Sequence, residues 1–411
     1  MRPLEEVRAH VLRTVRRLDS EQIDFRDGLW RVLTEPVVAS ENVPHFANSA
    51  MDGFAVQGAD VEEAGAILTI VEDVAAGQVA DSTLGSGEAI RIMTGAPLPD
   101  GANTVVRVED TSVANGNVTI GVEVPAGNYV RPAGGDVAAG QTVFDAGVRM
   151  GPMHVGVLAT LGKVAPVVSR RPKVAIMSTG DELQPAETTD LAPGMIRDSN
   201  RPMLRSILQA VGVEIIDYGT VPDEADSLRS TLGRAAVEAD VIITTGGVSM
   251  GDYDVTKIVL KDVTDVDFIS VAMKPGKPFA FGQLGGTPFF GLPGNPVSVM
   301  VSFEQFVRPA LLSMQGATRV LRPQIPGVAG ETLETDPEKT VFLRVQLSYQ
   351  GGKVVAVPTG SQASNVLSGA ATADAFAVVP RGVADVEEGD AVIIELFRAL
   401  ETRTVADDTR R

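Results

Sequence analysis

KVAIMST at residues 173–179 and DVIITTGG at residues 240–247 are short apolar runs that end in polar or glycine residues. Between them lie RPMLRSILQAVG at 201–212, VEIIDYG at 213–219 and DSLRSTLGRAAVEA at 226–239. Apolar runs bounded by turn residues are typical of buried strands, whereas the two longer segments have helical spacing. Strand and helix therefore alternate, which predicts right-handed βαβ units and a parallel sheet with helices on both faces.

The same pattern continues toward the C-terminus through DFISVAM, PFAFG and PFFGL to the long apolar segment PVSVMVSFEQFVRPALL at 296–312. We therefore expect one α/β domain over residues 171–318. In sheets of this kind ligands bind beyond the carboxyl ends of the strands. The residues that directly follow each predicted strand are thus the first candidates for a site.

Residues 48–136 carry short Val, Ile and Thr runs separated by glycine and asparagine, which predicts a small β-rich domain. Residues 319–411 hold similar runs at near-regular spacing, which predicts a C-terminal β-barrel. Leu4, Val7 and Val11 begin an amphipathic helix, and we expect a second helix, around GVLATLG, to pack beside it. Residues 1–47 and 137–170 would then form one discontinuous, elongated linker and dimerisation domain.

Composition excludes several classes of function. The 53 acidic and 35 basic residues give a net charge of −18, which disfavours nucleic acid as a partner. The chain has no cysteine and only three histidines, so thiolate catalysis and His/Cys zinc sites are excluded or nearly so. Any metal must bind oxygen ligands, which favours Mg²⁺. No apolar run approaches a bilayer span, so we expect no membrane contact and a cytoplasmic location.

Glycine-rich and proline-rich turns follow the predicted strands. The first is a loop whose glycines permit positive φ and whose N–H groups suit an anion; it comprises Gly246, Gly247, Val248, Ser249 and Gly251. It is neither a P-loop nor a dinucleotide fingerprint. Taken alone, it is explained equally well as a turn without a ligand.

Two further turns contain lysine and proline. Lys274 and Lys277 flank a stiff Pro-Gly turn, which suits a tetrahedral oxyanion. Pro293, Asn295 and Pro296 precede a predicted helix, whose first N–H groups are free to bind an anion. Three such turns at one sheet edge predict a phosphate or oxyanion site.

Carboxylates follow the same strands. Asp181 and Glu182 come after the first strand, Asp223 after the second, and Asp254 after the glycine loop. Together they could hold Mg²⁺ on a substrate phosphoanhydride. For Asp223 alone, capping of the following helix is the better explanation.

Six segments in this order resemble the molybdopterin molybdenumtransferases (MoeA) and the related gephyrin E domain. They are NSAMDGFA (48–55), RIMTGAP (91–97), STGDEL (178–183), TTGGVSMGDYD (244–254), MKPGKP (273–278) and GLPGNPVS (291–298). The resemblance covers nearly the whole chain. It implies four domains and an elongated homodimer, in which the α/β domain of one subunit faces the small β domain of the other.

The activity implied by this resemblance is Mg²⁺-dependent insertion of molybdate into adenylylated molybdopterin, with release of AMP. The upstream adenylyltransferase and acceptor molybdoenzymes are the further partners to expect. The implied catalytic residues are Asp52, Asp136, Asp223, Asp254 and Lys274. The implied substrate-binding residues are Thr94, Arg131, Glu182, Gly246, Gly247, Val248, Ser249, Gly251, Lys277, Pro293, Asn295, Pro296, Arg344 and Ser364. The implied metal ligands are Asp52, Glu182, Asp223 and Asp254.

Two departures from the family pattern bear on substrate choice. The family often reads GED where this chain has Gly134-Gly135-Asp136, and it often has a basic residue where this chain has Ser270. Two alternatives to the insertion activity stay open. One is a molybdopterin adenylyltransferase, which the α/β domain also resembles. The other is a non-catalytic, gephyrin-like scaffold.

Overall fold

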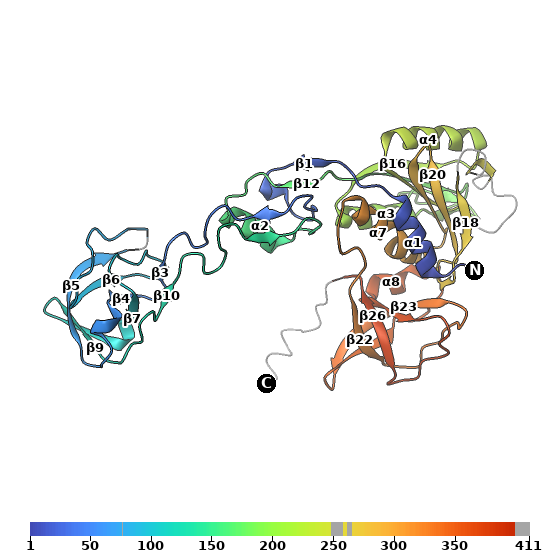
Figure 1. Ribbon diagram of the computed structural model, residues 1–411. Coiled ribbons are helices and arrows are strands. Elements are labelled where there is room, and N and C mark those ends of the chain that lie inside the picture. The colour runs from blue at the N-terminus through green and yellow to red at the C-terminus, as the bar shows by residue number, and fades with distance from the viewer. Residues whose placement is uncertain (76, 248–257, 261–264, 399–411) are drawn as a thin grey trace.

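The computed structural model describes residues 1–75, 77–247, 258–260 and 265–398 of an elongated molecule (Figure 1). Its largest sheet has the order β16-β13-β17-β21-β20-β18. The strands are β13 (Lys173–Thr179), β16 (Glu214–Val221), β17 (Val241–Thr245), β18 (Asp267–Ser270), β20 (Pro278–Leu284) and β21 (Thr287–Leu292). The predicted parallel arrangement is confirmed for β16, β13, β17 and β21. β20 pairs antiparallel with β21, to which it is joined by a tight hairpin at Gly285 and Gly286, both of positive φ. β18 pairs antiparallel with β20 and forms the edge of the sheet.

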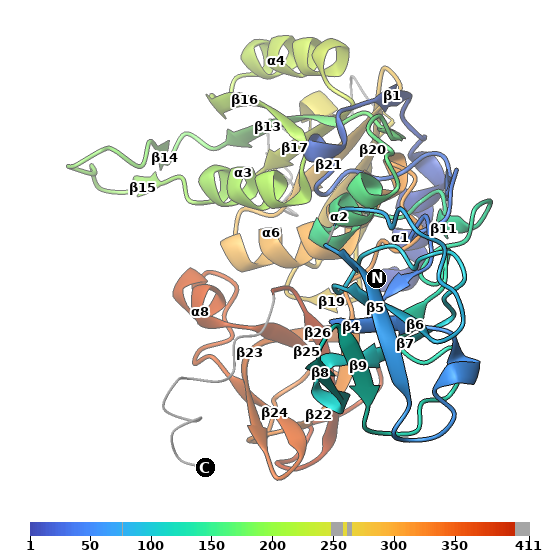
Figure 2. The same ribbon diagram turned by 90° about the vertical axis from the view of Figure 1, so that its left-hand side faces the viewer.

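Helices cover both faces of this sheet (Figure 2). The described helices are α1 (Leu4–Thr14), α2 (Pro152–Thr160), α3 (Asn200–Val211), α4 (Ala225–Glu238), α6 (Pro296–Ser302), α7 (Arg308–Met314) and α8 (Leu367–Thr372), with a π-helical turn, η4 (Phe303–Val307), between α6 and α7. Leu204 and Leu208 of α3 join one buried cluster with α6 and α7, and Leu228 and Leu232 of α4 join a second. No helix in the described part of the chain is long and apolar enough to cross a bilayer.

The N-terminal helix α1 belongs to the α/β core. Leu4, Val7 and Val11 are buried in the same cluster as α7. Helix α2 instead places Leu158 in a separate cluster and contacts the short 3-10 helix η1 (Phe25–Asp27). The expectation that α2 packs beside α1 is therefore wrong. An apolar stripe shows that a helix is half-buried, but not which core receives it.

A narrow arm joins this body to the small β domain (Figure 1). Its outgoing and returning chain segments pair antiparallel along the arm. The pairs are β1 (Ser20–Gln22) with β12 (Val167–Ser169), β2 (Val37–Val38) with β11 (Thr142–Phe144), and β3 (Asn48–Ser49) with β10 (Val130–Arg131). This pairing holds together the two sequence segments that flank the β-rich insertion.

The small β domain, at the far end of the arm, is a six-stranded sheet in the order β7-β4-β6-β5-β9-β8. Its strands are β4 (Gly53–Val56), β5 (Ile67–Val74), β6 (Glu88–Ile92), β7 (Thr104–Arg107), β8 (Thr111–Ala114) and β9 (Asn117–Ile120). Short 3-10 turns, η2 (Gly58–Asp60) and η3 (Val108–Asp110), follow two of them. Phe54 and Ala55, adjacent in β4, fall in different buried clusters because neighbouring strand residues face opposite sides.

The C-terminal region forms the predicted barrel. Its strands are β22 (Gln324–Ala329), β23 (Thr340–Gln350), β24 (Lys353–Pro358), β25 (Ala375–Val379) and β26 (Ala391–Leu396). They pair in the order β23-β24-β22-β26-β25, and β25 returns to β23 to close the barrel. A short strand of the α/β domain, β19 (Met273–Lys274), pairs with the start of β23. This contact brings the barrel against the edge where the predicted site lies.

Candidate active site

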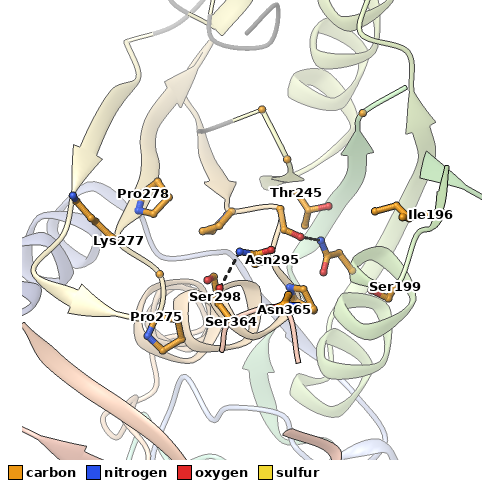
Figure 3. A pocket seen from close by; sticks show the side chains of 18 of the residues that line it. Ile196, Ser199, Thr245, Pro275, Lys277, Pro278, Asn295, Ser298, Ser364 and Asn365 are labelled. Carbon is orange, nitrogen blue, oxygen red and sulfur yellow. Dashed lines mark hydrogen bonds between the residues drawn. The ribbon is translucent and has the colours of Figure 1, made fainter. Parts of the chain in front are cut away.

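A cavity of about 1040 Å³ lies beyond the carboxyl ends of β13, β17 and β21 (Figure 3). Pro275, Lys277 and Pro278 lie on one side of it, and Ile196 and Ser199 lie on the opposite side. The sequence-predicted residues that line it are Glu182, Asp223, Gly246, Gly247, Lys274, Lys277, Pro293, Asn295, Pro296 and Ser364. The three predicted anion-binding turns thus share one cavity.

The glycine loop begins directly at the end of β17. Gly246 and Gly247 have φ of 88° and 65°, a region that side chains disfavour. A Cβ on Gly246 would lie 2.5 Å from the carbonyl oxygen of Thr179. Glycine is therefore required for the loop to pass this close to β13. The predicted residues Val248, Ser249, Gly251 and Asp254 lie outside the described residues.

The lysine turn, from Lys274 to Lys277, is held in place by contacts of its backbone. Lys277 accepts a hydrogen bond through its carbonyl oxygen from Val271 N–H at 2.8 Å. Gly276 between the lysines has φ of 99°, and a Cβ there would meet the Met273 side chain at 2.4 Å. Both lysine side chains are exposed and line the cavity. The turn therefore presents two ammonium groups from a constrained backbone.

The proline turn, which contains Pro293, Asn295 and Pro296, connects three parts of the structure. Asn295 Nδ2 donates to Ser364 Oγ at 2.9 Å (Figure 3). The N–H of Val297 donates to the Ser364 carbonyl at 3.1 Å. Asn200, at the start of α3, donates through Nδ2 to the Gly294 carbonyl at 2.6 Å. The cavity wall is thus held by α3, α6 and a loop of the barrel.

Asp198 is a wall residue that the sequence analysis missed. It is 3% exposed and accepts hydrogen bonds from Ser178 Oγ at 2.5 Å and from the N–H groups of Asn200 and Arg201 at 3.0 and 3.1 Å. It therefore joins the end of β13 to the start of α3. The available signal was an Asp two residues before the first residue of α3, close to where capping residues are expected.

Arg344 does not line the cavity, but it bonds to a loop that does. Its side chain is fully buried and donates to the carbonyl oxygens of Ser361, Gln362 and Ala363 at 2.6, 3.4 and 3.3 Å. Burial lowers the pKa of Arg344 from its ordinary value. Its role here is to hold the loop that carries Ser364.

Two of the predicted carboxylates face the cavity. Glu182 and Asp223 both line it, and Asp223 N–H donates to Asp181 Oδ1 at 3.1 Å. Helix α4 has Glu224 rather than Asp223 at its N-cap position, and the Glu224 side chain makes no capping hydrogen bond. Within the described residues, no three acidic or histidine side chains gather closely enough to hold a metal ion.

The remaining predicted residues, Asp52, Thr94, Arg131 and Asp136, directly precede β4, follow β6, belong to β10 and follow β10. These elements lie at the far end of the arm from the α/β domain (Figure 1). Asp52 Oδ1 accepts from Thr94 N–H at 2.7 Å and from Thr94 Oγ1 at 2.8 Å. The backbone bond from Thr94 and then its hydroxyl bond lower the pKa of Asp52 from its ordinary value. Arg131 pairs with Asn48 between β10 and β3, and Asp136 N–H donates to the Val43 carbonyl at 3.0 Å.

Family models match most of the chain. The MoeA N-terminal region (domain I and II) matches residues 2–162, a probable molybdopterin-binding domain matches 175–313, and the MoeA C-terminal region (domain IV) matches 326–397.

Full-length relatives agree with these models. Molybdopterin molybdenumtransferase 2 of Mycobacterium tuberculosis is 37% identical, over 95% of this chain and 98% of its own. The molybdopterin molybdenumtransferase of Haemophilus influenzae is 35% identical, over 93% and 95%. The crystal structure of the molybdopterin biosynthesis MoeA protein from Pyrococcus horikoshii matches with a TM-score of 0.85 and 28% identity, over 97% of this chain and all of that one. The chain therefore belongs to the molybdopterin molybdenumtransferase family.

Proposed function

We propose that this protein inserts molybdate into adenylylated molybdopterin and releases AMP, as a step of molybdenum cofactor biosynthesis. The observation that carries the proposal is one cavity that combines anion-binding turns, lysines and carboxylates at the carboxyl edge of a parallel sheet. Such a cavity suits a ligand with phosphate groups and a second, tetrahedral oxyanion. The family relatives carry the corresponding enzyme name.

In this proposal each group of residues has a separate task. The backbone at Gly246 and Gly247 and the start of α6 hold phosphate through N–H groups. Lys274 and Lys277 hold molybdate beside the dithiolene sulfurs, and stabilise the negative charge on the oxygens that are transferred. Sulfur for molybdenum comes from the ligand, which agrees with a chain that has no cysteine.

Magnesium is proposed as the metal of this site. Glu182 and Asp223 supply carboxylate oxygens to the cavity, and Mg²⁺ commonly binds through one or two carboxylates together with substrate phosphates. The donor set therefore fits Mg²⁺, with Asp254 and Asp52 as the further proposed ligands. When bound, Mg²⁺ would neutralise charge on the phosphoanhydride.

A second copy of the chain would complete the site. Asp52 and Asp136 are proposed to orient water or accept a proton. Asp52 directly precedes β4 and Asp136 follows β10, at the end of the arm that is remote from the α/β domain of the same chain (Figure 1). We therefore propose a homodimer in which the small β domain of one subunit faces the cavity of the other. The narrow arm between the two regions is consistent with this arrangement.

The test is an assay of purified protein with adenylylated molybdopterin, Mg²⁺ and molybdate. AMP should be released, and the product should reconstitute a cofactor-free molybdoenzyme. Formation of adenylylated molybdopterin from molybdopterin and ATP would instead identify an adenylyltransferase. Binding of adenylylated molybdopterin without AMP release would identify a scaffold.

A further inference from the structure

Lys339 is a lysine of the cavity that belongs to the C-terminal barrel. Its side chain lines the cavity together with Lys274 and Lys277. The pairing of β19 with β23 fixes its position, since Met273 is the register partner of Thr340, and Thr340 N–H donates to the Ala272 carbonyl at 2.9 Å. The barrel thus places a cation next to the turn that carries Lys274.

Asp336 holds this lysine. The Lys339 ammonium contacts Asp336 Oδ2, while Glu338 N–H donates to Asp336 Oδ1 at 3.1 Å. The two side chains are 21% and 23% exposed, so solvent screens the pair less than it would screen a fully exposed pair. The backbone turn from residue 336 to residue 339 is closed by a hydrogen bond from Lys339 N–H to the Asp336 carbonyl at 2.9 Å.

Asp336 also responds to a second lysine of the cavity. The pKa of Asp336 is lowered mainly by the hydrogen bond from Lys339 and, to a smaller extent, by the hydrogen bond from the N–H of Glu338. The positive charge of Lys274 lowers it further. One carboxylate therefore interacts with lysines from both the barrel and the α/β domain. Any anion that binds to these ammonium groups has to compete with it.

On the basis of the proposed function, we propose that Lys339 is a third cation for a tetrahedral oxyanion in this cavity, and that Asp336 is the internal carboxylate with which the oxyanion competes. An ammonium group has three donors, so Lys339 can turn toward a dianion that offers more charge and more acceptors than one carboxylate. The bond between Lys339 and Asp336 would then lower the affinity of the cavity for an anion, because the anion has to displace Asp336 from Lys339.

Equilibrium dialysis of the full chain against molybdate tests this proposal, because it measures binding without turnover. Lys339→Gln should raise the Kd of molybdate about threefold to tenfold, and Lys339→Arg should restore most of the loss. Asp336→Asn should act in the opposite direction and lower the Kd about threefold. Asn keeps the acceptor oxygen for Glu338 N–H, so the turn is retained.

Glu338→Gln is the matched control, since it removes the same charge from the same turn and leaves the Lys339 pair intact. It should change the Kd of molybdate less than Asp336→Asn does.

The experiment has further outcomes. If Lys339→Gln weakens and Asp336→Asn strengthens the binding of AMP rather than of molybdate, the proposal is supported and the phosphate group is the anion. Weaker binding in both Lys339→Gln and Asp336→Asn would show that the pair is only structural, and would overturn it. No molybdate or AMP binding by the parent chain would overturn it as well. Because dialysis needs no turnover, absent AMP release alone would count against the proposed function and not against this pair.

Discussion

Asp52 accepts both hydrogen bonds of Thr94 on one carboxylate oxygen, which an amide oxygen can also do. Asp52→Asn should therefore fold normally, while losing the charge that a proton acceptor or metal ligand needs. We expect AMP release to slow at least about 100-fold, the lower end for loss of one acid–base group. Asp60→Asn is the matched control, because Asp60 also accepts a hydroxyl and a backbone N–H, from Ser86 and Gly87. Release at the parent rate would make Asp136 the leading catalytic carboxylate.

The same residue predicts a pH effect on stability. The Thr94 bonds hold the pKa of Asp52 below its ordinary 3.8, so the ionised form stabilises the folded state. A lowered folded pKa gives stability that is present above the unfolded pKa and is lost as the pH falls through the folded value. The parent should therefore lose more stability than Asp52→Asn as the pH falls below about 4, measured by urea midpoints. Parallel pH curves for the two proteins would contradict this.

At the scale of single residues, sequence could predict turns but not their partners. Lys274 and Lys277 stand out because prolines flank them, whereas Lys339 looks like any surface lysine until β19 and β23 pair. Asp198 was missed for a similar reason, because its contact with Ser178 joins residues from different elements. The spacing of residues within one segment does not show which distant segments will pair with it.

At the scale of elements, a substitution at Gly246, directly after β17, tests whether the glycine loop must lie close to β13. Gly246→Ala should destabilise the fold by about 1–3 kcal/mol, because positive φ and contact with the Thr179 carbonyl both oppose a side chain. Gly294→Ala is the control, since a Cβ there has open space in the neighbouring turn. Urea unfolding measures both proteins. Equal stability of the two variants would mean that the loop moves away from β13 without cost.

Helix α1 shows why element placement is harder to predict than element existence. Its apolar spacing predicts the helix, but its burial depends on η4 and α7, which are distant in the sequence. The bond from Arg8 Nε to the carbonyl of Gln305 in η4 joins residues 297 positions apart. Leu4→Ala should therefore cost the α/β domain about 2–5 kcal/mol of unfolding free energy. Val237→Ala, on the exposed face of α4, should change it by less than about 0.5 kcal/mol. A loss for Leu4→Ala as small as that control would show that α1 is not part of the core.

At the scale of the whole molecule, the βαβ alternation predicts the site edge because strand direction fixes where loops gather. It does not predict how far the small β domain lies from the α/β domain, which depends on the paired arm segments and is visible only in the folded chain (Figure 1). Nor does it predict the antiparallel edge, which depends on two glycines in one hairpin.

That separation leads to a prediction about assembly. If the site forms between subunits, an Asp52→Ala chain and a Lys274→Ala chain each lack one half of it, and a hybrid dimer contains one intact site that combines the parent halves. Mixing the two inactive proteins under conditions of subunit exchange should therefore restore AMP release, up to about one quarter of the parent rate for random pairing.

Subunit exchange is followed independently of activity with a fluorescent label on each chain. A mixture of Asp52→Ala with Asp52→Ala carrying a different label controls for the exchange procedure and should stay inactive. Proven exchange without recovery would place Asp52 and Lys274 in the same site of one chain, and would require the arm to bend until the small β domain reaches its own cavity.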